Sequence, residues 1–253
     1  MGQRLQALLW DVDGTMAETE FEGHRHGFNL AFKEAGVPWH WDPDTYRGLL
    51  AVSGGRERLA AYRHQQGEAP WPREKLETLM AAKQRHYVSL VADGGLALRP
   101  GVAALIAEAQ AADIPQAIVT TSSRSAVAAL LGALAPNLTG AFAFWVCGED
   151  VARKKPDPQG YQLALDQLGV SAGAVVVLED SIAGLAAATA AALPCLVTLS
   201  DLSRAEPAAS FLAAAAVVDN LEPTRGPVQV RRGPACDQTR VTLCYLQQLL
   251  ERR

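Results

Sequence analysis

The feature that most limits the fold of this chain is a series of short apolar runs that end in acidic or small residues and alternate with helix-like stretches. These runs are Leu5–Trp10, Gln116–Thr120, Ala174–Leu178 and Leu193–Thr198, with a weaker one at Phe142–Cys147. Strands that alternate with helices build a parallel sheet covered on both faces, so we predict an α/β fold. In such sheets, functional side chains collect where the strands end. Asp11, Thr121 and Asp180 each follow a predicted strand and are expected to meet there.

The strand pattern is interrupted between residues 18 and 94 by charged, helix-like sequence. It includes HRHGFNLAFKEAG, GRERLAAYRHQQG and PREKLETLMAAKQRHYVSLVAD. We predict that residues 18–94 form an α-helical cap inserted after the first strand, and that residues 1–17 and 95–220 form the core. Residues 221–253 are proline-rich and irregular until a final helix-like run, and we expect this tail to pack on the core.

Composition argues against several function classes. The 253 residues carry a net charge of −4 and no long basic run, which gives no support for a nucleic-acid partner. No apolar run approaches the roughly 20 residues of a membrane span, and the first residues lack a secretory signal. The four cysteines are scattered without metal-binding or disulfide spacing, as is typical of free thiols in a reducing compartment. We therefore expect a cytoplasmic protein without a membrane partner, and nothing in the sequence requires more than a monomer.

Four short motifs carry the candidate chemistry. The run ALLWDVDGT ends on two acids one residue apart, and two buried carboxylates are costly unless a cation, hydrogen-bond donors or a shared proton compensates them. The other three motifs are TTSSR, RKKPDP and VVVLEDSIAGL. Together they supply a nucleophilic carboxylate, an acid/base carboxylate, a hydroxyl, an ammonium group and further acids for a cation. That set of groups is suited to phosphoryl transfer.

Each motif alone also has a purely structural interpretation. An Asp-Gly pair is a common turn, and Thr121 with Ser122 could cap the following helix. Glu179 and Asp180 suit the first turn of a helix, where acids are favoured. Lys154 and Lys155 could be solvated surface charges. The presence of all four motifs in this chain favours the functional interpretation.

In this order, DVDGT, TTSSR, KKPDP and LEDSIAGL resemble the four motifs of the haloacid dehalogenase-type phosphatases. The resemblance covers about residues 5–200 and implies a Rossmann-like core with a small α-helical cap, and Mg²⁺ as cofactor. It implies that Asp11 is the nucleophile, forming an aspartyl phosphate, and that Asp13 is the acid/base. Thr121 would hold the phosphoryl group and Lys155 would neutralise its charge, with Lys154 only a neighbour. The implied metal ligands are Asp11, the backbone carbonyl of Asp13, Glu179 and Asp180.

The predicted cap resembles the CbbY-type members of this family, which are associated with carbon-fixation genes and similar to xylulose 1,5-bisphosphate phosphatases. The matching segments are ETEFEGHRHGFN, WDPDTYRGLLAVSGGRERL and AAKQRHY. The residues that the resemblance and the motifs place near a sugar bisphosphate are Glu20, Tyr46, Ser53, Gly54, Gly55, Arg56, Arg58, Lys83, Ser122 and Arg124. The chain departs from the pattern twice: FEGH carries one extra residue before His24, and Arg56 stands where lysine is usual.

The sequence therefore predicts a Mg²⁺-dependent phosphatase that converts xylulose 1,5-bisphosphate to xylulose 5-phosphate. A sugar phosphomutase of the β-phosphoglucomutase type shares the four motifs and a similar cap, and is the alternative; the segment SGGRER favours the phosphatase. A non-catalytic metabolite-binding module is a third hypothesis, which the intact acids and lysine disfavour. The five histidines show no metal-ligand spacing and all fall in the predicted cap.

Overall fold

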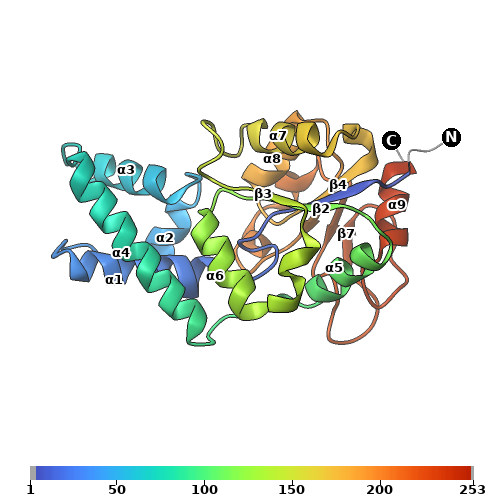
Figure 1. Cartoon of the computed structure of the whole chain (residues 1–253), viewed down its shortest axis with the longest axis horizontal. Coiled ribbons are helices and arrows are strands. Elements are labelled where there is room, and N and C mark those ends of the chain that lie inside the picture. Colours follow the sequence, from blue (N-terminus) through green and yellow to red (C-terminus); the bar gives the residue numbers. More distant parts are fainter. Residues whose placement is uncertain (1–3, 252–253) are drawn as a thin grey trace.

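A computed structural model describes residues 4–251, in which a seven-stranded sheet forms the core (Figure 1). The strands are β1 (Ala7–Trp10), β2 (Gln116–Val119), β3 (Phe144–Val146), β4 (Val175–Glu179), β5 (Cys195–Thr198), β6 (Ala216–Val218) and β7 (Val230–Arg232). Their order is β3-β2-β1-β4-β5-β6-β7, and every neighbouring pair is parallel except β6 and β7. β1 lies between β2 and β4, so the polar residues that follow these three strands lie at one edge of the sheet.

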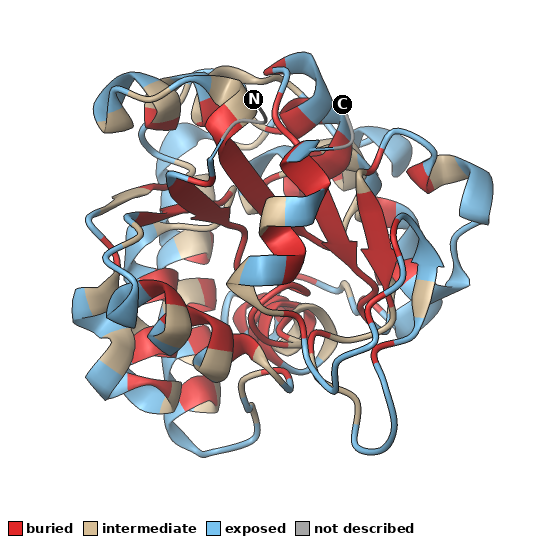
Figure 2. Ribbon diagram, turned by 90° about the vertical axis from the view of Figure 1, so that its right-hand side faces the viewer, coloured by how far each residue is buried: buried red, intermediate tan, exposed pale blue. Residues whose placement is uncertain are grey.

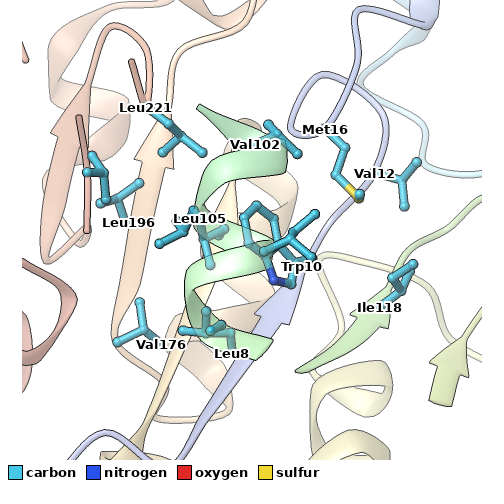
Figure 3. Packing of buried hydrophobic residues seen from close by; sticks show 14 of the residues in the cluster. Leu8, Trp10, Val12, Met16, Val102, Leu105, Ile118, Val176, Leu196 and Leu221 are labelled. Carbon is cyan, nitrogen blue, oxygen red and sulfur yellow. The ribbon is translucent and has the colours of Figure 1, made fainter. Parts of the chain in front are cut away.

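Helices cover both faces of the sheet, as its continuous apolar strands require. One face packs against α5 (Val102–Ala111), α6 (Arg124–Leu134) and α9 (Leu243–Glu251), and the other against α7 (Gln159–Leu168) and α8 (Ile182–Ala190). Figure 2 shows the strands of the sheet buried between these layers. Successive strand residues face opposite sides of the sheet. Leu8 and Trp10 pack toward α5 (Figure 3), whereas Ala7 and Leu9 pack toward α7 and α8. The predicted α/β fold is confirmed.

A group of helices lies to one side of the sheet, on the left of Figure 1. It contains η1 (Glu20–Arg25, a π-helix), α1 (His26–Glu34), α2 (Pro43–Leu49), α3 (Gly55–Gln65) and α4 (Arg73–Ala92). These helices share a separate aromatic cluster in which the Trp41 ring packs 4.7 Å from Phe28 and 4.9 Å from Phe32, measured between centroids. Because this cluster is distinct from the two sheet clusters, the helices form a cap with its own core, as the fold prediction required.

The two chain segments that join the cap to the core are held together by Arg99. Its backbone N–H donates to Met16 O at 2.8 Å, and its buried guanidinium donates to the carbonyls of Gly14, Thr198 and Leu199. Glu18 accepts from Arg99 Nε at 3.1 Å. Arg99 therefore fixes the start of the cap connection against the loop after β1 and the end of β5.

The segment after β5 is more regular than the sequence indicated. β6 and the antiparallel edge strand β7 extend the sheet, and α9 closes it with Tyr245, Leu246 and Leu249 buried. The predicted segments 1–17 and 221–253 include residues 1–3 and 252–253, which lie outside the described residues. Among the helices of residues 4–251, none is both long and apolar enough to cross a membrane.

The burial of α9 predicts that this last helix contributes to the stability of the core. Leu246→Ala removes a fully buried side chain and should lower the free energy of unfolding by about 2–5 kcal/mol, measured by urea denaturation. Leu212→Ala is the control, because Leu212 is 61% exposed and its truncation should change stability by less than about 0.5 kcal/mol. Equal effects of the two variants would contradict the packing of α9 on the sheet.

Candidate active site

The central strand ends bring the predicted catalytic residues together. Asp11 and Asp13 follow β1, Thr121 follows β2, and Glu179 and Asp180 stand at the end of β4. Asp11, Glu179 and Asp180 each offer an oxygen within 4.8 Å of the others. The convergence expected from the strand ends is therefore present in the structure.

Lys155 connects the nucleophile candidate to the end of β4. Its ammonium donates to Asp11 Oδ1 at 2.7 Å, to Glu179 Oε1 at 2.6 Å and to the carbonyl of Val119 at 2.8 Å. Burial by itself would lower the pKa of Lys155, but the charges and hydrogen bonds of the two carboxylates outweigh it and raise the pKa. Lys155 is thus held as a cation whose position relative to Asp11 is fixed by three acceptors.

Glu179 is fully buried, and donors surround both of its oxygens. Oε1 accepts from Lys155 and from the hydroxyl of Tyr161, and Oε2 accepts from the amides of Asp180 and Ser181 and from the Ser181 hydroxyl. A Cβ on Gly184 would lie 1.9 Å from this carboxylate, so only glycine leaves room for it there. Glu179 therefore orients Lys155; its predicted role as a metal ligand stays a prediction.

Asp11 and Asp180 fit a divalent cation by their charge. Burial raises the pKa of Asp180 to about 8, with the negative charge of Glu179 as the next cause. Burial and then Glu179 also raise the pKa of Asp11, against the opposing effect of Lys155. Asp11 shares the single charge of Lys155 with Glu179, so the three acids of this cluster are only partly compensated, and an oxygen-preferring ion such as Mg²⁺ would supply the missing positive charge.

Asp13 lies among donors from both the core and the cap. One oxygen accepts from the Thr19 hydroxyl and lies 2.9 Å from His24 Nε2, and the other accepts from the Ser122 hydroxyl. Burial alone would raise the pKa of Asp13, but its interaction with His24, together with the hydrogen bonds of the two hydroxyls, lowers it below its usual range. This arrangement holds Asp13 as a carboxylate, the form that accepts a proton.

His24 is a site residue that the sequence analysis missed. Lys83 Nζ lies 2.7 Å from His24 Nδ1, and the imidazole stacks on Tyr87 at 4.4 Å between centroids. A protonated lysine can only donate, so Nδ1 accepts and Nε2 carries the proton directed at Asp13. The predicted substrate residue Lys83 therefore also supports Asp13 through His24. The extra residue of FEGH lies within η1, a π-helix, which is the helix type that absorbs one added residue.

The cap side of the site contains a second buried polar chain. The Tyr46 hydroxyl donates to Glu20 Oε2 at 2.7 Å and accepts from Arg58 at 2.7 Å, and Arg58 lies 3.6 Å from Glu20. Burial is the main reason that the pKa of Tyr46 is raised, so its hydroxyl keeps its proton. Tyr46 thus fixes the positions of Glu20 and Arg58 through these two hydrogen bonds.

Two cavities adjoin this set of residues. One, of about 570 Å³, is lined by Asp11, Asp180, Lys155 and Ser53 among others. The other, of about 540 Å³, is lined by Gly54, Gly55, Arg56, Lys83 and Ser122 among others. Asp13, Glu20, Arg58 and Thr121 line both cavities. Apart from Tyr46 and Arg124, which line neither cavity, the predicted substrate residues are divided between two neighbouring spaces, with the acid/base candidate lining both.

Arg124 is not brought into either cavity. Its guanidinium donates to Asp150 Oδ2 at 2.6 Å and to the carbonyl of Trp145 at 3.1 Å. Its predicted contact with substrate requires these two bonds to be exchanged and stays a prediction.

Comparison with known proteins agrees with this geometry. Residues 5–192 match the model of the family described as haloacid dehalogenase-like hydrolases. The chain belongs to this family and is a phosphoric monoester hydrolase, as the motifs predicted. Within it, the chain is 46% identical to the protein CbbY of Cereibacter sphaeroides, over 80% of this chain and 87% of that protein. This confirms the resemblance to CbbY-type proteins.

Solved structures agree with the sequence match. A mutant of CbbY from Rhodobacter sphaeroides in complex with xylulose 1,5-bisphosphate has a TM-score of 0.80 and 42% identity, and the match covers 85% of this chain and 94% of that one. The β-phosphoglucomutase of Clostridium difficile has a TM-score of 0.71 at 20% identity, covering 85% of this chain and 91% of that one, and so shares the fold alone.

The charge imbalance at Asp11 and Asp180 predicts how stability responds to pH and Mg²⁺. An unfolded Asp180 releases its proton near its usual pKa of 3.8, whereas the folded protein keeps it to about 8. Without metal, the folded state binds more protons than the unfolded state in this interval. The melting temperature should therefore fall as the pH rises from about 6 to about 8.5. Saturating Mg²⁺ should raise it by about 5–10 °C at the higher pH and less at the lower pH.

The control for this experiment is Asp180→Asn, which should flatten the decline with pH and reduce the shift produced by Mg²⁺. Differential scanning fluorimetry in EDTA and in Mg²⁺ measures both effects without requiring enzyme activity. A melting temperature in EDTA that rises over this pH interval would count against the assignment.

The hydrogen bond from His24 predicts a kinetic effect. His24→Phe keeps the stacking on Tyr87 but removes the donor to Asp13, and should lower kcat for phosphate ester hydrolysis by about 10²-fold or more. His26→Phe is the matched control, because His26 lies on the same helical segment and faces Arg25 and Glu22 instead. If both variants retain full kcat, His24 has no part in the acid/base function.

Proposed function

We propose that this protein is a Mg²⁺-dependent phosphatase that hydrolyses xylulose 1,5-bisphosphate to xylulose 5-phosphate. The observation that carries the proposal is the division of the site into two neighbouring cavities. The nucleophile candidate Asp11 lines one, and the glycine loop with Arg56 lines the other. A sugar with a phosphate at each end matches this arrangement, and the related CbbY structure contains such a sugar.

In the proposed reaction, the free oxygen of Asp11 attacks the phosphorus of the phosphate on C1. The bond from phosphorus to the sugar oxygen breaks, and Asp13, which must first take up a proton from solvent because the resting site holds it as a carboxylate, passes that proton to the departing oxygen. Asp13, as a carboxylate, then takes a proton from water, which attacks the aspartyl phosphate and releases inorganic phosphate. Thr121 and Lys155 hold the phosphoryl oxygens throughout.

The proposed metal ligands are Asp11, the backbone carbonyl of Asp13 and Asp180, with Glu179 behind them. Mg²⁺ bound there supplies positive charge between the carboxylate of Asp11 and the phosphate, which otherwise repel each other.

We further propose that residues 18–94 close over the substrate as a cap. Glu20 and Arg58 would bind the sugar, held by Tyr46, while Gly54, Gly55 and Arg56 would receive the second phosphate. The proposal includes a cytoplasmic, monomeric enzyme. Its support is that the four cysteines are free, with three of them buried, and that one chain supplies all the site residues.

The test is phosphate release with Mg²⁺ from four compounds: xylulose 1,5-bisphosphate, ribulose 1,5-bisphosphate, phosphoglycolate and β-glucose 1-phosphate. We expect a marked preference for the first compound. Asp11→Asn should lower kcat by on the order of 10⁴-fold, because the amide cannot form the aspartyl phosphate.

Two other outcomes have distinct meanings. Hydrolysis of the other esters alone would retain the chemistry and reject the substrate assignment. Formation of glucose 6-phosphate from β-glucose 1-phosphate, without release of inorganic phosphate, would identify a phosphomutase instead.

A further inference from the structure

The cavity with the glycine loop contains a cation from the core that the sequence analysis treated only as a neighbour of Lys155. This cation is the ammonium of Lys154, which lies 2.8 Å from Glu57 Oε1 and 3.0 Å from Glu57 Oε2. Lys154 belongs to the core loop before α7, whereas Glu57 lies in the first turn of α3 in the cap. Both residues line the cavity, so this ion pair joins core and cap inside it.

Glycines on both sides make room for the Lys154 side chain. Gly54, at φ +92°, has a backbone conformation that side chains rarely adopt, and a Cβ there would lie 2.8 Å from Lys154 Nζ. On the core side, a Cβ on Gly148 would lie 3.3 Å from Lys154 Cε and 2.4 Å from the carbonyl of Thr121. The ammonium therefore lies directly against the Gly54–Gly55 loop, with only 17% of its side chain exposed.

Of the other cations near this cavity, Arg56 lines it beside Gly55 and is already proposed to meet the second phosphate, whereas Arg58, Lys83 and Arg124 have more tightly bound partners. Arg58 is buried with Tyr46 and Glu20, and Lys83 is hydrogen-bonded to His24. Arg124 is directed away, toward Asp150. Lys154 differs because its partner Glu57 is 45% exposed and can return to water at little cost.

We propose that Lys154 is a substrate-binding residue for the phosphate remote from Asp11, and that this phosphate displaces Glu57 from the ammonium. The inference rests on the proposed bisphosphatase function and names a specificity residue for it. A phosphate dianion offers three acceptor oxygens to a lysine that is already largely desolvated, and such charge-assisted bonds are strong. A monophosphate leaves the Lys154–Glu57 pair intact and gains nothing at this position.

Two substrates that differ only in the remote phosphate test this proposal: xylulose 1,5-bisphosphate and xylulose 1-phosphate. Lys154→Met should lower kcat/KM for the bisphosphate by about 10- to 100-fold, mostly through KM, and change that for the monophosphate by less than about threefold. Glu57→Gln keeps the ammonium and removes its competitor, so kcat/KM for the bisphosphate should be retained or increased. Lys33→Met, at an exposed position of the cap, is the control for loss of a positive charge.

The opposite effects expected of the two variants separate ligand binding from a simple clamp between cap and core. If Lys154→Met and Glu57→Gln lower kcat/KM equally for both substrates, the pair is only a clamp and the proposal is wrong. If the wild type prefers the bisphosphate and Lys154→Met keeps that preference, this inference alone fails. If the wild type shows no preference for the bisphosphate, the proposed function fails and the inference fails with it. Lys154→Gln repeats the test with a polar side chain should the methionine variant not fold.

Discussion

The site depends on one buried ammonium group shared by two carboxylates. Lys155 lies between Asp11 after β1 and Glu179 at the end of β4, and all three are nearly or fully removed from solvent. Removing the lysine would leave two buried carboxylates facing each other, which is far more costly than the pair is stabilising. Glu179 is in turn fixed by Tyr161 and Ser181. The orientation of Asp11 is therefore set by a chain of contacts that begins in the packing of the sheet.

The acid/base candidate depends on the cap in a way that the nucleophile does not. Asp13 receives Ser122 from the core, but Thr19 and His24 belong to the segment that leads into the cap. Arg99 fixes the ends of this connection to the core through Gly14, Leu199 and Glu18. A movement of the cap would thus change the donors around Asp13 while Asp11 and Lys155 stayed in place. If the cap closes over the substrate as proposed, the same movement would set the hydrogen bonds around Asp13.

The sequence predicted the strands of the central sheet to within a few residues, because each is a short apolar run closed by a polar residue. The runs Leu5–Trp10 and Ala174–Leu178 correspond to β1 and β4, shifted by two residues or fewer at each end. β6 was missed because it continues an alanine run that is typical of a helix, and β7 because it consists of Val230 and two arginines. β6 pairs with β5 and β7 pairs with β6, and no local pattern reveals these partners. Short strands of this kind are determined by tertiary contacts rather than by their own sequence.

The residues of the candidate site show the same difference between positions that local sequence reveals and positions that tertiary contacts determine. The acids, Thr121 and Lys155 follow strands or belong to motifs, and the sequence analysis could place them. His24 has no motif; the sequence analysis placed it at the start of the helix-like stretch HRHGFNLAFKEAG, and this position does not show that the side chain faces Asp13. The partners of Arg124 lie more than 20 residues away in the chain, so its direction could not be predicted either.

Lys154 and Lys155 show most clearly what the sequence leaves open. They are adjacent and chemically identical, yet Lys155 pairs with two core carboxylates and Lys154 with a cap carboxylate 97 residues away. Lys155 lines the cavity of the nucleophile, and Lys154 lines the cavity of the glycine loop. One short loop thus supplies a positive charge to each of the two spaces that a bisphosphate would occupy. Because the loop is covalently continuous, the distance between these two charges is limited by the backbone and not by the position of the cap.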